Sequence, residues 1–151
     1  METMKMMLVD DEERFLSTTQ KLLAKKGYEI LTATSGPEAL DTMRRQTVHV
    51  VILDVKMPGM DGIAVLKAIK RDYPLVEVIM LTGHATVESA VDGLKSGAID
   101  YLMKPTSIDD IIAKAGEAFE KRQHHEEKIR VAQARLIMKS PRQIIKEFEK
   151  Q

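Results

Sequence analysis

The chain has 151 residues, a mass of 17.0 kDa, and 23 basic and 23 acidic side chains, which suits one well-buried domain with an appendage. A hydrophobic content of 44% and a charged content of 30% exclude a disordered or fibrous chain, and no apolar run approaches the roughly 20 residues of a membrane span. The lack of Cys excludes disulfides, thiolate zinc sites and thiol nucleophiles, so oxygen and nitrogen atoms must carry any chemistry.

The N-terminal part of the chain predicts two strand–helix units. An apolar run over residues 5–9 predicts a strand, and apolar residues with helical spacing follow it. Residues 29–34 predict a second strand, and the capping box formed by Ser35 and Glu38 predicts the helix after it. The N-terminal apolar stretch is too short for a signal peptide, and acidic residues follow it directly, so we expect a cytoplasmic protein.

A third unit contains the most apolar strand. Residues 48–53 are apolar without alternation, as expected of a central parallel strand that is covered on both faces, and the run stops at Asp54. A turn follows, after which Asp61 can cap a helix with apolar residues over 65–69.

Two further units complete the pattern. Residues 76–81 and 98–103 predict strands, with a helix over about 86–95 between them. A capping box that begins at Ser107 predicts a last helix, whose apolar positions continue to Phe119. Five alternating units predict an α/β fold, a doubly wound parallel sheet with helices on both faces, because crossovers between parallel strands are right-handed and cover the sheet.

The C-terminal residues 123–151, here called the tail, differ from the domain that we expect over 3–122. A thin apolar stripe runs through a predicted helix, which breaks near Ser140 before a short terminal helix. The stripe needs a partner surface: a second copy, the body of the same chain, or a missing domain. We favour a homodimer.

Charge distinguishes the tail from the domain as well. Residues 1–119 carry 14 basic and 18 acidic side chains, and residues 120–151 carry 9 and 5. This weak excess of positive charge fits a solvated helix face better than a nucleic-acid site, and we expect no direct contact with nucleic acid or a membrane.

Polar residues follow four of the predicted strands. Since ligands bind at the carboxyl ends of parallel strands, these residues should converge there. Three carboxylates repel one another unless a cation neutralises them, and oxygen ligands favour Mg²⁺, with Mn²⁺ as a substitute. Such a site, with a hydroxyl and an ammonium, suits phosphoryl transfer, and the carboxylate after the most apolar strand is the best nucleophile. The residues are Asp10, Asp11, Asp54, Thr82 and Lys104.

These residues resemble the receiver domains of two-component response regulators. The resemblance spans about residues 3–122 and includes the acidic pair and the segments 50–62, 81–83 and 101–105. It implies a flavodoxin-like sheet of strand order 2-1-3-4-5. It also implies that a sensor histidine kinase phosphorylates Asp54.

The resemblance assigns further roles at the site. Asp11, Asp54 and the backbone carbonyl of Lys56 are implied to bind Mg²⁺ directly, and Asp10 is implied to bind it through water. The Lys56 side chain and His84 are expected to modulate the access of water to the phosphoryl group.

The resemblance also implies a conformational switch. Lys104 should pair with the acyl phosphate and precede a cis bond to Pro105. Thr82 should move toward the phosphoryl group while the ring of Tyr101 turns inward, which remodels the face made by the fourth helix, fifth strand and fifth helix. This face, or the tail, is the expected dimer surface.

Other functions fit the residues less well. A phosphohydrolase of the haloacid dehalogenase type would need an Asp general acid at position 56, where this chain has Lys56. A flavin carrier would need a phosphate loop after the first strand, and acidic residues there would repel the phosphate. The segment 55–62 resembles receivers of bacterial enhancer-binding transcription activators, so we expect transcription regulation if an output domain is present. A receiver excised with its linker and a natural stand-alone regulator are both compatible with the sequence.

Overall fold

The computed structural model describes residues 3–56, 61–83 and 87–138, together with 142, 146 and 149. Its sheet has five parallel strands in the order β2-β1-β3-β4-β5, which confirms the predicted fold and strand order. The strands are β1 Lys5–Val9, β2 Glu29–Ala33, β3 Val50–Asp54, β4 Glu77–Thr82 and β5 Asp100–Met103.

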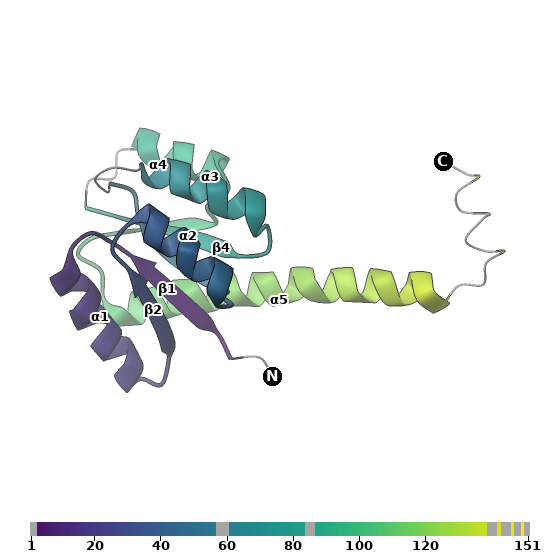
Figure 1. Cartoon of the computed structure of the whole chain (residues 1–151), viewed down its shortest axis with the longest axis horizontal. Helices are drawn as coiled ribbons and strands as arrows, with labels where there is room; N and C mark the ends of the chain where they lie inside the picture. The colour runs from purple at the N-terminus through teal and green to yellow at the C-terminus, as the bar shows by residue number, and fades with distance from the viewer. Residues whose placement is uncertain are drawn as a thin grey trace.

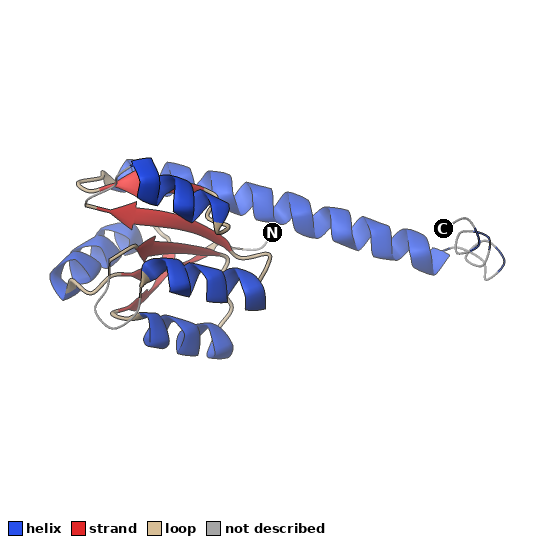
Figure 2. Cartoon of the chain, turned by 90° about the horizontal axis from the view of Figure 1, so that it is seen from above, coloured by secondary structure: helices blue, strands red, loops and turns tan. Residues whose placement is uncertain are grey.

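Helices cover both faces of the sheet, as Figures 1 and 2 show. One core cluster joins α1 and α5 to the sheet, and the other joins α2 and α3 to the opposite face. The helix α4 lies beside α3. The helices are α1 Glu13–Lys25, α2 Gly36–Arg45, α3 Gly62–Asp72, α4 Val87–Lys95 and α5 Ile108–Met138.

The central strand β3 explains the uniform apolar run. All of its residues are buried, with Val51 and Leu53 in one core cluster and Val50 and Ile52 in the other. The strand begins two residues later than predicted because its pairing with β1 starts at the register pair Met6 and Val50. Both faces of this strand therefore contribute to holding its last residue in place.

Three predicted helix caps are present. The Ser35 hydroxyl accepts a hydrogen bond from the backbone N–H of Glu38. In the same way, the Asp61 carboxylate caps α3 and the Ser107 hydroxyl caps α5. The carboxylate of Glu38 differs from the usual capping box, since it bonds to the N–H and hydroxyl of Thr34, one residue before the cap.

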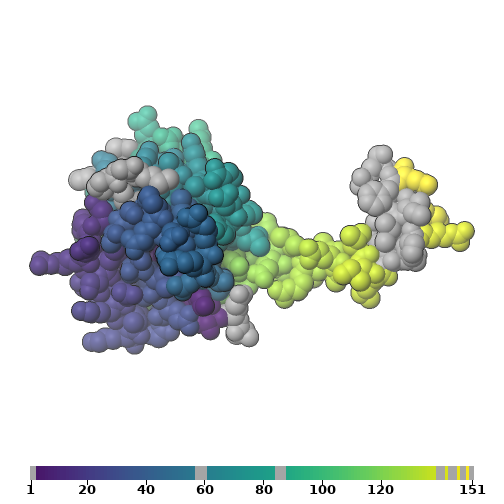
Figure 3. All heavy atoms as spheres, viewed as in Figure 1, coloured from purple at the N-terminus to yellow at the C-terminus, as the bar shows by residue number. Residues whose placement is uncertain are grey.

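The last helix continues well beyond the sheet (Figures 1 and 3). Its first part buries Ile111, Ala115 and Ala118 against the domain, whereas Ile129 and Leu136 in the projecting part are 43% and 51% exposed. One uninterrupted helix thus links the predicted domain to the first half of the tail. The predicted break near Ser140 lies outside the described residues, and no helix within 3–56, 61–83 and 87–138 is long and apolar enough to span a membrane.

Candidate functional site

The carboxyl edge of the sheet brings together three carboxylates from two neighbouring strands. Asp10 and Asp11 directly follow β1, and Asp54 is the last residue of the adjacent β3. One carboxylate oxygen from each residue lies within 4.8 Å of the others. The convergence predicted for these residues is present, and the oxygen donors fit a hard divalent cation such as Mg²⁺.

Lys104 reaches this cluster from the end of β5. Its Nζ atom lies 2.6 Å from Oδ2 of Asp10, which is fully buried, and 3.8 Å from Oε1 of Glu12. Burial by itself lowers the pKa of Lys104, but the hydrogen bond and charge of Asp10, with the charges of Asp54 and Glu12, raise it above its ordinary value overall. Lys104 is therefore a cation at neutral pH and balances part of the acidic charge.

The environment of Asp54 disfavours ionisation of its carboxyl group. Its residue is 8% exposed, and burial is the main reason that its pKa rises to about 6, with the charges of Asp10 and Asp11 adding to the effect. The backbone N–H of Lys56, 3.2 Å from Oδ1, works in the opposite direction. A carboxylate held in this way gains from any cation that approaches it.

A glycine lets α3 begin directly against the strand end that carries Asp54. A Cβ atom at Gly62 would lie 2.6 Å from the backbone oxygens of Asp54 and Val55, closer than any side chain allows. The N–H of Gly62 instead donates to the Val55 carbonyl at 3.0 Å. Gly62 is not among the site residues expected from the sequence, although a glycine just after a predicted helix cap is a usable signal for close backbone approach.

The expected switch residues occupy different environments. Thr82 is the last residue of β4 and is 5% exposed, and its carbonyl accepts a hydrogen bond from the Lys104 N–H. Tyr101 on β5 is 39% exposed, so its side chain lies at the surface. The bond between Lys104 and Pro105 is cis, as the resemblance implied. His84 lies outside the described residues.

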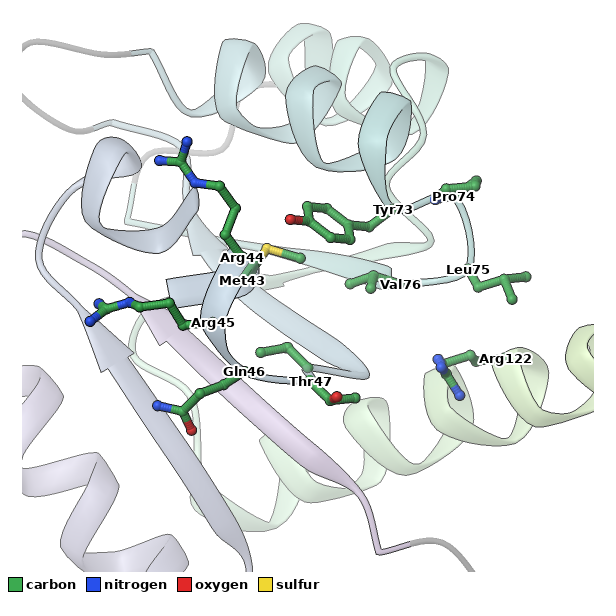
Figure 4. A pocket seen from close by; sticks show the side chains of 11 residues that line it. Met43, Arg44, Arg45, Gln46, Thr47, Tyr73, Pro74, Leu75, Val76 and Arg122 are labelled. Atoms are coloured by element: carbon green, nitrogen blue, oxygen red, sulfur yellow. The ribbon is translucent and has the colours of Figure 1, made fainter. Parts of the chain in front are cut away.

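A pocket of about 450 Å³ opens at the other end of the sheet (Figure 4). Val48 and Val76 line it just before β3 and β4 begin, which places it at the amino ends of the strands. Tyr73 and Arg122 are among the other lining residues and come from the α3–β4 connection and from α5. The pocket is therefore separate from the carboxylate cluster.

The fold and the carboxylate cluster together define a receiver-type α/β domain. The chain belongs to the response regulator receiver domain family, which matches residues 6–116. This finding confirms the family expected from the motifs. Receiver domains are in general regulatory rather than enzymatic, and the comparisons give no support to the phosphohydrolase alternative.

The relatives are transcriptional regulators. The chain is 42% identical over 112 residues to the transcriptional regulatory protein ZraR of Escherichia coli K12, a match that covers 74% of the chain and 25% of that protein. It is 39% identical over 111 residues to the DNA-binding transcriptional regulator NtrC of Klebsiella pneumoniae, covering 74% and 24%. The chain spans about a quarter of the length of these curated relatives.

Solved structures agree with this assignment. A CheY-like receiver domain protein from Methanospirillum hungatei JF-1 has a TM-score of 0.78 at 29% identity, covering 82% of this chain and 99% of the other. NtrX from Brucella abortus has a TM-score of 0.79 at 30% identity, covering 86% of this chain and 30% of the other.

Proposed function

We propose that this domain accepts a phosphoryl group on Asp54 from a sensor histidine kinase and thereby changes a binding surface. The observation that carries the proposal is the cluster itself: three carboxylate oxygens within 4.8 Å, with the ammonium of Lys104 at 2.6 Å from one of them. Three carboxylates at the carboxyl edge of the sheet destabilise the fold through their mutual repulsion, so a structural role alone does not explain why they are clustered.

The cluster offers oxygen donors of the kind that magnesium prefers. Asp11, Asp54 and the carbonyl of Lys56 would hold Mg²⁺ directly, and Asp10 would hold it through water; Mn²⁺ accepts the same oxygen ligands. When bound, the ion neutralises negative charge on the phosphoryl oxygens. Asp11 is exposed and Asp10 is fully buried, which favours Asp11 as a direct ligand that an ion entering from solvent can reach.

Asp54, Lys104 and Thr82 have separate roles in the phosphoryl transfer. The Asp54 carboxylate attacks phosphorus, the bond from phosphorus to the kinase histidine breaks, and its electron pair stays with the imidazole. Lys104 contributes a positive charge for a phosphoryl oxygen, and Thr82 contributes a hydroxyl at the end of the neighbouring strand. The domain promotes its own phosphorylation and a slow loss of the phosphoryl group.

The surface that responds is the face of α4, β5 and α5. Val91 and Leu94 on α4 are 41% and 43% exposed, and Met103 on β5 is 52% exposed beside Tyr101. Covering these exposed apolar side chains with a partner protein would favour binding. We propose that phosphorylation controls the formation of a homodimer through this face or through the projecting part of α5. Because the relatives are transcriptional regulators, we infer control of transcription through an attached output domain.

Labelling with acetyl phosphate tests this function directly. With Mg²⁺ present, the wild-type protein should gain one phosphoryl group by intact mass, whereas Asp54→Asn should gain none because the amide is not a competent nucleophile. Asp61→Asn is the matched control, since Asp61 is an exposed helix cap outside the cluster. Undiminished labelling of Asp54→Asn would move the acceptor to another residue.

A further inference from the structure

An aromatic ring covers the ammonium group of Lys104. The Nζ atom lies 4.5 Å from the centroid of the Phe15 ring, within the range of a cation–π contact. The Lys104 side chain is 18% exposed, so the contact is partly shielded from water. The ring thus adds a third contact to the two that the ammonium makes with carboxylates.

One short segment supplies all three contacts. Asp10 follows β1, Glu12 is the N-cap residue of α1, and Phe15 lies in the first turn of that helix. The Glu12 side chain makes no cap hydrogen bond, and its carboxylate lies near Lys104 instead. The start of α1 therefore surrounds a cation that comes from the far edge of the sheet.

The ring differs from the carboxylates in what it does to the charge. A carboxylate neutralises the ammonium and competes with any phosphoryl oxygen for it. The face of an aromatic ring attracts the cation more weakly and takes up none of its hydrogen-bond donors in a strong bond. A lysine side chain has a flexible stem of four carbons, so a ring on one side also restricts the positions that the ammonium can reach.

We propose that Phe15 is a positioning residue that holds the Lys104 ammonium over the carboxylate cluster, ready for the phosphoryl group. This inference rests on the proposed function for its consequence, but the contact itself exists without phosphorylation. The aromatic character of residue 15, rather than its volume alone, sets the position of the cation.

Three variants separate aromatic positioning from packing. Phe15→Leu removes the ring and keeps an apolar side chain, and Phe15→Tyr keeps the ring. Phe119→Leu is the matched control, because Phe119 packs on the same core cluster but contacts the ring of His49 instead of Lys104.

The first measurement needs no phosphoryl donor. In the wild-type protein, the ring current of Phe15 should shift the NMR signals of the Lys104 ε-methylene protons upfield. The shift should persist in Phe15→Tyr and Phe119→Leu and disappear in Phe15→Leu. An identical Lys104 signal in Phe15→Leu and wild type would overturn the proposal.

The second measurement links the contact to the reaction. We expect Phe15→Leu to lower the maximal rate of labelling by acetyl phosphate about threefold to tenfold, the range that a partly shielded cation–π contact accounts for. The dissociation constant for Mg²⁺ should stay within about twofold, and Phe15→Tyr should restore the rate. An equal loss in Phe15→Tyr or Phe119→Leu would show that packing is responsible and would overturn the proposal. Absence of labelling in wild type would instead refute the proposed function, and the ring-current shift would then decide the positioning by itself.

Discussion

Replacing Asp54 by Asn should stabilise the folded protein at neutral pH when magnesium is absent. Burial chiefly raises the pKa of Asp54 from 3.8 to about 6, and the N–H of Lys56 offsets only part of that effect. The unfolded chain loses this proton near pH 3.8, whereas the folded protein keeps it until about pH 6, so the free energy of unfolding falls across that interval. At about 1.4 kcal/mol for each pH unit, the ionised carboxylate destabilises the folded protein by about 3 kcal/mol.

The variant lacks this ionisation, so its advantage must depend on pH. We expect Asp54→Asn to raise the free energy of unfolding by about 2 to 3 kcal/mol near neutral pH. At about pH 4 we expect a rise of only about 0.5 kcal/mol, because Asp54 is still protonated in the folded protein and only partly ionised in the unfolded chain. Urea unfolding followed by circular dichroism, with a chelator present, measures both values. Asp61→Asn is the control, because Asn caps a helix about as well as Asp. Equal stabilities of wild type and Asp54→Asn at neutral pH would refute the reasoning.

Three further outcomes are expected. Because Mg²⁺ requires ionised Asp54, calorimetry should show about tenfold weaker binding at pH 5 than at pH 7, and equal affinities would contradict the raised pKa. Truncation after Phe119 should give monomers in sedimentation runs while labelling persists; a surviving dimer would place the interface on the face of α4, β5 and α5. Replacing Lys56 or His84 by Ala should change the lifetime of the phosphorylated protein, measured by loss of label, and an unchanged decay would exclude their role in limiting attack by water.

Local patterns in the sequence were enough to predict the fold. The spacing of apolar residues predicted five strand–helix units, and serine and aspartate caps located helix starts, because these features act within a few residues of one another. Right-handed crossovers then required a parallel sheet, which brings strand ends to one edge. The meeting of Asp10, Asp11 and Asp54 follows from that topology, and the structure confirms it.

The details of the site needed the folded chain. The ion pair of Lys104 with Asp10 joins residues 94 positions apart, and the contact of Lys104 with Phe15 depends on where the first turn of α1 lies relative to β5. No local pattern specifies such distances, since they result from the packing of separate elements. The backbone approach at Gly62 and the rise in the pKa of Asp54 likewise depend on burial by distant segments.

The sequence by itself therefore determined which residues reach the carboxyl edge of the sheet, because periodicity, caps and handedness are local or topological properties. Only the tertiary structure decided how Lys104 divides its contacts among Asp10, Glu12 and Phe15, and that α5 continues without a break to Met138. Those outcomes depend on side-chain packing and desolvation between segments far apart in the chain.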